Sequence, residues 1–268
     1  MTSFHSSQPV RLGIVGCGAI VREAHLPVII GDRRVEVTVL CDRDRRIATQ
    51  TARASGINDA AIVTDPAELA GKVDAVIVAA PPRFHAPIAI DLMKMGIDVL
   101  CEKPLAITVA DGRTMAQTAR ETGRVLAVAH MMRFFPHNRW LADLVEEGEI
   151  GEVHEVIVED GAPLDWPMAS NSYFDRNATG GGVLFDTGVH LLDRMLWLFG
   201  DLTGIAYEDD AFGGFENNAK LTGVLHIGGR PVPARLEFSW SHRLRRSIRV
   251  VGERGTLEAS TSDPRTLT

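Results

Sequence analysis

The stretch VRLGIVGCGAI, residues 10–20, decides how the first half of the chain folds. Its first six residues are nearly all apolar and rich in β-branched side chains, which is typical of a strand buried in a parallel sheet. Gly16 and Gly18 then permit a tight turn and let the backbone approach a pyrophosphate, although Val21 stands where a third glycine is usual. A helix that follows offers unpaired N–H groups to the phosphates. The predicted cofactor-binding residues of this turn are Gly16, Gly18, Ala19 and Ile20.

Outward from this stretch, short β-branched runs alternate with helical ones. The expected strands are Val10–Val15, Val35–Cys41, Ala61–Thr64, Ala75–Ala80, Asp98–Cys101 and Val125–Ala129. The expected helices lie near Ala19–Ile30, Asp44–Ala54, Pro87–Met95 and Val109–Thr122. Because crossovers between parallel strands are right-handed, this order predicts an α/β Rossmann domain over residues 1–130, with a doubly wound parallel sheet.

The pattern changes after His130. Helices are expected near Asn138–Glu147 and Gly182–Leu198, with a long loop over Gly161–Thr179 and a frayed polar tail over Ser260–Thr268. The expected strands are Val153–Glu159, Asn218–Ile227, Ala234–Ser241, Ser247–Gly252 and Thr256–Ala259. This order predicts an α+β domain over residues 131–268 with a largely antiparallel open sheet. Aromatic residues of the loop, in Asp165–Pro167 and Tyr173–Phe174, could stack on a sugar or pack in the core or an interface.

Asp42 ends the second expected strand, where an acid can accept hydrogen bonds from the adenosine ribose. A carboxylate at this place repels a 2′-phosphate and therefore favours NAD. Arg43 follows directly and could bind such a phosphate, so NADP stays open.

Two further strand ends carry polar residues, and the carboxyl ends of parallel strands form the ligand crevice of such sheets. Pro81, after the fourth strand, suits a loop under the nicotinamide ribose. His85, a few residues on, is either a cofactor ligand or a structural histidine. Glu102 and Lys103 follow the fifth strand, and both are predicted to contact the cofactor. Glu102 is expected to form structural hydrogen bonds rather than to act as a second base.

The motifs taken together resemble those of the Gfo/Idh/MocA oxidoreductases, the family of glucose–fructose oxidoreductase and inositol dehydrogenase. The resemblance runs from about Val10 to Glu258. It rests on the glycine turn and on Glu102-Lys103-Pro104, Met132-Arg133-Phe134-x-Pro136, Gly148-x-Ile150-Gly151, Gly180-Gly181-Gly182, Asp186-x-Gly188-x-His190-x-x-Asp193 and Gly252-x-x-Gly255-Thr256.

The resemblance implies that this chain dehydrogenates polyols, sugars or sugar derivatives with NAD(P). It further implies that Lys103, Asp186 and His190 are catalytic, that the second domain binds the substrate, and that the protein is a homodimer or homotetramer. The residue chemistry agrees with these roles. Asp186 and His190, four apart, would share a helix face, so that the carboxylate orients the imidazole as a base. The Lys103 ammonium would stabilise a developing alkoxide or polarise a carbonyl.

The composition argues against several other classes of protein. The net charge of −7 argues against a nucleic-acid partner, and the basic run Arg243–Arg249 fits a solvated strand face. Three cysteines make no closed disulfide set, and no signal peptide or apolar membrane span is read, so a cytoplasmic location is expected. No spacing of Cys, His or acidic residues indicates a metal.

Two other functions compete with simple hydride transfer. Redox-assisted glycoside hydrolysis would recycle bound NAD, whereas a dehydrogenase would produce NADH in proportion to its product. A non-catalytic NAD-sensing regulator would have no use for the catalytic set, and the presence of Lys103, Asp186 and His190 argues against it.

Overall fold

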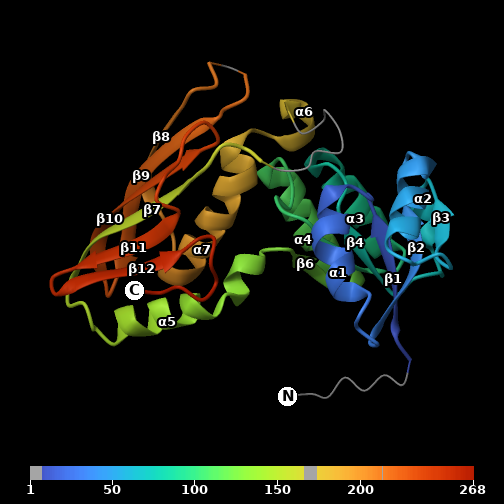
Figure 1. Ribbon diagram of the computed structural model, residues 1–268, viewed down its shortest axis with the longest axis horizontal. Helices are drawn as coiled ribbons and strands as arrows, with labels where there is room; N and C mark the ends of the chain where they lie inside the picture. The colour runs from blue at the N-terminus through green and yellow to red at the C-terminus, as the bar shows by residue number, and fades with distance from the viewer. Residues whose placement is uncertain (1–7, 166–173, 213) are drawn as a thin grey trace. The chain divides into compact units, whose positions relative to one another are not determined.

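The computed structural model describes residues 8–165, 174–212 and 214–268 (Figure 1). By internal contacts the chain forms two compact units. The first contains the chain up to Ala129 and also takes in Asn177–Gly180, and the second begins at His130 and includes Gly181–Thr268.

The first unit is built on a six-stranded parallel sheet in the order β3-β2-β1-β4-β5-β6. The strands are β1 Val10–Val15, β2 Val35–Cys41, β3 Ala61–Val63, β4 Ala75–Val78, β5 Asp98–Cys101 and β6 Leu126–Val128. The helices are α1 Leu26–Ile29, α2 Arg45–Ala54, α3 His85–Lys94 and α4 Val109–Thr122, with 3₁₀ turns at Pro66–Leu69 and Pro82–Phe84. The predicted Rossmann order is confirmed. The first helix begins at residue 19, as expected, but Val21–His25 within it form a π-helix.

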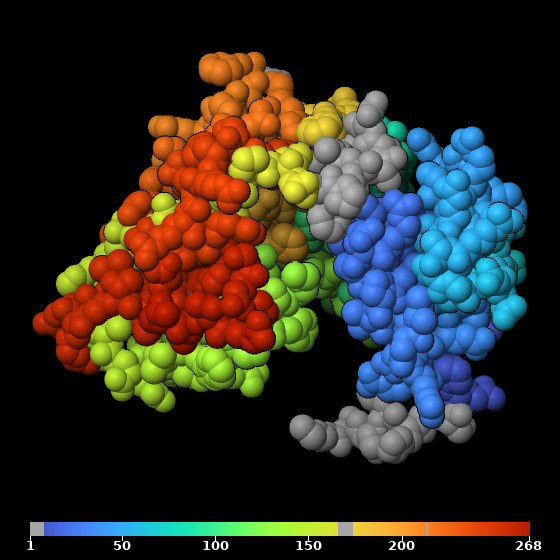
Figure 2. Space-filling view, viewed as in Figure 1, coloured from blue at the N-terminus to red at the C-terminus, as the bar shows by residue number. Residues whose placement is uncertain are grey.

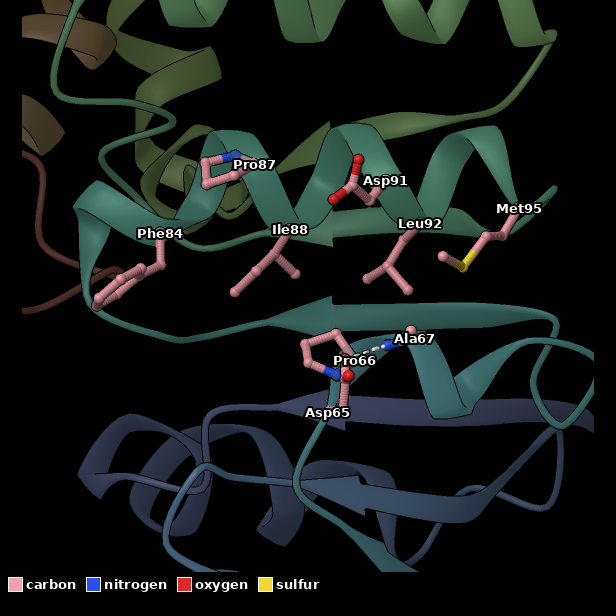
Figure 3. A pocket seen from close by; sticks show the side chains of 9 residues that line it. All are labelled: Asp65, Pro66, Ala67, Phe84, Pro87, Ile88, Asp91, Leu92 and Met95. Carbon is pink, nitrogen blue, oxygen red and sulfur yellow. Dashed lines mark hydrogen bonds between the residues drawn. The ribbon is translucent and has the colours of Figure 1, made fainter.

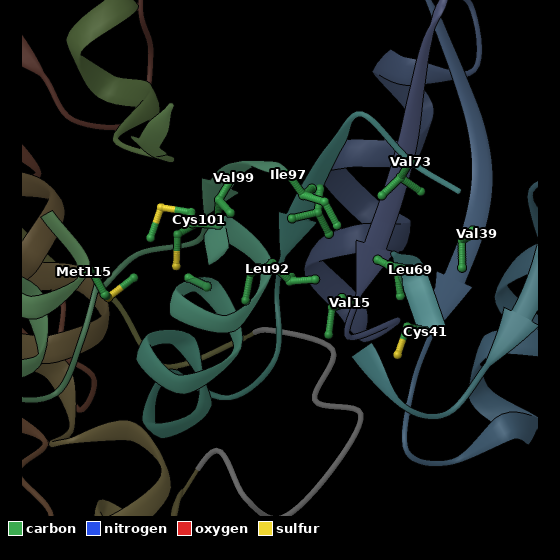
Figure 4. Packing of buried hydrophobic residues seen from close by; sticks show 14 of the residues in the cluster. Val15, Val39, Cys41, Leu69, Val73, Leu92, Ile97, Val99, Cys101 and Met115 are labelled. Carbon is green, nitrogen blue, oxygen red and sulfur yellow. The ribbon is translucent and has the colours of Figure 1, made fainter. Parts of the chain in front are cut away.

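Successive side chains of the buried strands enter opposite faces of this sheet, so the unit has two apolar layers. Val76 and Val78 of β4 pack in the layer that contains residues of α3 and α4, shown in Figure 4. Ile77, between them, packs in the other layer with residues of α1 and α2. The cysteines Cys17, Cys41 and Cys101 are free and buried in these layers, and burial raises the pKa of each thiol to about 12.

The second unit contains a six-stranded mixed sheet in the order β12-β11-β7-β10-β9-β8, in which only β7 and β10 are parallel neighbours. Its strands are β7 Val153–Gly161, β8 Thr203–Asp209, β9 Asn218–Ile227, β10 Arg230–Ser239, β11 Ser247–Gly252 and β12 Gly255–Ser260. Its helices include α5 Pro136–Glu146 and α7 Val189–Phe199, and the π-helix Leu184–Gly188 leads directly into α7. The predicted α+β architecture is confirmed.

The basic run Arg243–Arg249, which leads into β11, forms ion pairs with acids on neighbouring strands. Arg249 pairs with Glu159 of β7, Arg245 lies 2.7 Å from Glu258 of β12, and Arg246 lies 3.3 Å from Asp160 of β7. These ion pairs offset the charges of Arg245, Arg246 and Arg249.

Three expectations for the second half were wrong, and they concern strand β8, the loop Gly161–Thr179 and the tail Ser260–Thr268. Strand β8 was missed because all seven of its residues are exposed, so no buried alternation marks it, and pairing with β9 creates it. The expected loop Gly161–Thr179 contains the short helix α6 Arg176–Thr179, and residues 166–173 of it lie outside the described residues.

The tail is not frayed. Thr268 N donates to Glu258 O at 2.9 Å, and Thr261 donates its hydroxyl proton to the buried Asp160 carboxylate. These partners are far away in sequence, so the tail's polar composition did not reveal them. Figure 2 shows β12 in red beside α5 in green, and the two elements are in contact.

A buried histidine also holds this tail. Arg194 Nη2 of α7 lies 2.8 Å from His137 Nε2 of α5, and both side chains have no exposed surface. Since guanidinium groups only donate, His137 Nε2 accepts and Nδ1 carries the ring proton, facing the Pro264 carbonyl. His137 is therefore neutral in the fold.

We expect acid to weaken the fold through this ring. Burial, together with the charge of Arg194, lowers the pKa of His137. The stability that the neutral ring contributes is complete above about pH 6.5, the ordinary pKa of histidine, and is lost as the pH falls toward the lowered pKa. Urea unfolding at several pH values should show the decline, and His137→Gln, which gains no proton, should show a flatter profile. An equally steep profile in His137→Gln would assign the decline to other groups.

Candidate active site

The glycine turn has the geometry that the sequence predicts. Gly16 has a φ of +89°, and a Cβ on it would lie 2.6 Å from backbone atoms of Ala79 and Ala80. Only glycine allows β1 and the end of β4 to approach so closely. A Cβ on Gly18 would meet no protein atom within 4 Å, so packing does not require glycine there.

Asp42 lies directly against this turn. Cys17 N donates to Asp42 Oδ2 at 2.9 Å, and Asp44 N donates to Asp42 Oδ1 at the same distance. Each carboxylate oxygen keeps a second lone pair, so Asp42 can still accept from a ribose hydroxyl. The Arg43 side chain is exposed.

His85 bridges the loops that follow β4 and β5. Its Nε2 lies 2.7 Å from Ala80 O, its Nδ1 lies 2.8 Å from Pro104 O, and the residue is 1% exposed. Burial lowers the pKa of His85, an effect that the two carbonyls and the Glu102 charge partly offset. Both ring nitrogens thus face main-chain carbonyls, to one of which the neutral ring donates, and this fits the structural alternative better than direct cofactor contact. Pro81 immediately precedes the 3₁₀ turn between these loops.

The Lys103 backbone is fixed by a pair that the sequence did not reveal. Lys103 N donates to Glu102 Oε2 at 3.1 Å, and Glu102 Oε1 lies 2.7 Å from His25 Nε2. Glu102 is 8% exposed; burial alone would raise the pKa of its carboxyl, but the contacts with His25 and Lys103 lower it overall. His25 ends the π-helix after the glycine turn, so this pair joins the turn to the predicted catalytic lysine.

Asp186 and His190 lie along one continuous helix of the second unit, but their spacing is not purely α-helical. Asp186 belongs to the π-helix Leu184–Gly188, whose wider turns rotate the residues that follow, and His190 begins the next segment in α7. The helix between them is therefore not a regular α-helix, and a π segment is typical of functional sites.

His190 packs against His130, which lies beside the motif residues Arg133 and Asp193. The His130 and His190 rings meet edge to face with centroids 6.4 Å apart. Asp193 forms a two-pronged pair with Arg133, at 2.5 and 2.8 Å, and lies 3.5 Å from His130 Nδ1. This network fixes the surroundings of the predicted base.

A groove of about 270 Å³ lies between the 3₁₀ turn Pro66–Leu69 and α3 in the first unit (Figure 3). Its walls are mainly apolar, with Asp65 and Asp91 as the acidic residues. None of the predicted site residues lines it.

Two negative findings hold for the described residues. They contain no group of three or more His, Cys, Asp or Glu side chains placed to hold a metal ion. They also contain no helix that is both long enough and apolar enough to span a bilayer.

Comparison with known proteins identifies the class. Residues 10–130 match the family model described as an oxidoreductase family with an NAD-binding Rossmann fold, and residues 138–258 match the C-terminal domain model of the same family. The chain belongs to the Gfo/Idh/MocA family. The predicted family, fold class and nicotinamide cofactor class are confirmed.

Two named relatives show how similar this chain is to members of the family. The D-glucoside 3-dehydrogenase of Escherichia coli (strain K12) is 32% identical over 206 residues, which make up 75% of this chain and 57% of the relative. The dTDP-3,4-didehydro-2,6-dideoxy-alpha-D-glucose 3-reductase of Streptomyces violaceoruber is 30% identical over 92% of this chain and 72% of the relative. The chain thus spans little more than half of the first relative.

Solved structures have the same fold as this chain. A 3-ketoreductase from Actinomadura kijaniata, in complex with NADP and TDP-benzene, superposes with a TM-score of 0.80 at 27% identity over 93% of this chain and 76% of that one. GenD2 from gentamicin A biosynthesis, in complex with NAD, gives a TM-score of 0.81 at 26% identity over 97% and 74%.

Proposed function

We propose that this chain transfers a hydride between NAD(P) and a secondary alcohol or carbonyl of a sugar, polyol or sugar derivative. The observation that carries the proposal is the arrangement at the β1 end, where Asp42 binds the glycine turn and the His25–Glu102 pair joins that turn to Lys103. The named relatives act on sugar derivatives, which supports the substrate class.

The residues fit a dinucleotide. The turn leaves open space at Gly18, where a Cβ would meet no protein atom within 4 Å, and the amides at the start of the helix that follows suit the negative charge of a pyrophosphate. Asp42 would accept from the ribose, which favours NAD, and Arg43 would serve a 2′-phosphate. When bound, the nicotinamide supplies the hydride acceptor or donor.

The chain's own residues would move the proton. His190 would take the hydroxyl proton, Asp186 would orient the ring, and Lys103 would stabilise the negative charge that grows on the same oxygen.

We expect Asp42→Ala to weaken NAD binding by about 1.5–3 kcal/mol, the worth of hydrogen bonds to a charged group. Calorimetry with NAD and NADP measures the effect, and Asp59→Ala, at an exposed aspartate, is the control. Unchanged NAD affinity would exclude the ribose contact. Tighter binding of NADP than of NAD by the wild type would make Arg43 the leading contact.

The activity itself is tested with a panel of sugars and inositols, by following nicotinamide absorbance. NADH produced in proportion to the oxidised sugar supports the proposal. Glycoside cleavage without net NADH would replace it with redox-assisted hydrolysis.

We further propose a domain division at residue 130, a homodimeric or homotetrameric assembly and a cytoplasmic location. The three buried free cysteines support a reducing compartment. Light scattering of the purified protein would measure the assembly.

A further inference from the structure

A buried carboxylate lies at the start of the helix that carries Asp186. Glu216, on the loop before β9, is 4% exposed. Its Oε1 accepts from Gly182 N at 2.7 Å and from Leu184 N at 3.3 Å, and its backbone oxygen accepts from Val183 N at 3.1 Å. The first amides of a helix have no partner within the helix, and here one distant residue binds three in succession.

The close approach depends on a glycine. A Cβ on Gly182 would lie 2.0 Å from the Glu216 backbone oxygen, so any other residue would push the two segments apart. Gly182 is part of the glycine run, for which the sequence offered no structural reason.

A second contact holds the same π-helix just beyond Asp186. Trp240 Nε1 donates to Thr187 Oγ1 at 3.1 Å. The Trp240 ring also packs against Phe215, next to Glu216, with centroids 5.7 Å apart. The helix is thus held before Asp186 by Glu216 and after it by Trp240.

The loop that carries Glu216 is itself fixed. The Asp210 carboxylate accepts from Asn217 N at 2.8 Å and from Asn218 N at 2.9 Å. Burial raises the pKa of Asp210, but these hydrogen bonds lower it overall, so the carboxylate stays charged at neutral pH. The contacts to Gly182–Leu184 therefore come from an anchored loop.

We propose that Glu216 is a positioning residue that sets the π-helix bearing Asp186, and through it the base His190, by binding main-chain amides. The inference rests on the proposed function. The positive end of the helix dipole stabilises the buried carboxylate, which explains an acid at this place. Catalysis responds steeply to placement, since a shift of about 1 Å can cost roughly 10²-fold in rate.

The test compares Glu216→Ala with Glu216→Gln, whose amide oxygen can still accept from Gly182 N and Leu184 N. We expect Glu216→Ala to lower kcat by roughly 10–10²-fold. KM for NAD should be unchanged, because Glu216 contacts the start of the helix that carries Asp186 and His190 and not the residues proposed to bind NAD. Amide hydrogen exchange over residues 182–190 should accelerate in Glu216→Ala. Glu216→Gln should restore most of the wild-type kcat and most of the protection of these amides from exchange. Glu208→Gln, at an exposed acid of β8, is the control and should change neither.

Wild-type kcat in folded Glu216→Ala would overturn the proposal, as would Glu216→Gln as defective as Glu216→Ala. If Glu216→Ala does not fold, Gly182→Ala should reproduce the loss of kcat. Normal kcat in both Gly182→Ala and Glu216→Gln would then overturn the proposal. A wild type that neither oxidises a sugar nor reduces a keto sugar would refute the proposed function. The exchange measurement would still decide whether Glu216 holds the helix.

Discussion

His190→Ala should lower turnover by about 10²–10⁴-fold, the range that a general base contributes, while NAD affinity stays nearly intact. The reason is that His190 lies on α7 of the second unit, whereas the residues proposed to bind NAD lie in the first.

The pH profile gives the sharper measurement. Oxidation should rise with pH as the imidazole loses its proton, because only the neutral ring can take the hydroxyl proton. His190→Ala should lose this limb. His226→Ala, at an exposed ring of β9, controls for the general loss of a histidine and should keep it. A His190→Ala enzyme with near-normal turnover and an unchanged profile would remove His190 from the mechanism and leave Lys103 as the proton carrier.

The sequence predicts best those elements whose own residues decide their structure. The bounds of β1, β2 and β5 are as expected, because each strand contains a short buried run of apolar residues, such as Leu12–Val15 in β1 and Val39–Cys41 in β2, that the sequence itself shows. Strand β8 and the Ser260–Thr268 tail depend on partners elsewhere in the chain, such as β9 and Asp160, and nothing in their composition names those partners. The π-helices at Val21–His25 and Leu184–Gly188 likewise have no periodicity that separates them from α-helices.

The same distinction applies to the candidate site. Gly16 and Asp42 could be predicted because the turn and the strand end are local patterns, and the structure brings the two together through Cys17 N. His25 and Glu216 were missed because each acts through a residue far away in sequence. Their signal is a charged or titratable side chain that is largely buried, and burial is visible only in the fold.

Lys103→Met should lower turnover by about 10²–10³-fold, the usual cost of removing one group that stabilises a developing oxyanion. Methionine keeps the length and packing of the lysine stem but has no charge. The loss should fall on kcat rather than on KM for the sugar, because the charge that Lys103 stabilises grows only as the hydroxyl loses its proton. Lys94→Met, at the end of α3, is the matched control.

The double variant Lys103→Met/His190→Ala tests whether the two residues serve one step. Groups that act together on the same oxygen show strongly non-additive effects, so the double variant should be little slower than the slower single variant. Losses in kcat that multiply would mean that Lys103 and His190 act in separate steps. A Lys103→Met enzyme with normal kcat and a raised KM for NAD would instead make Lys103 a cofactor-binding residue, held in place by Glu102 and His25 but outside the proton transfer.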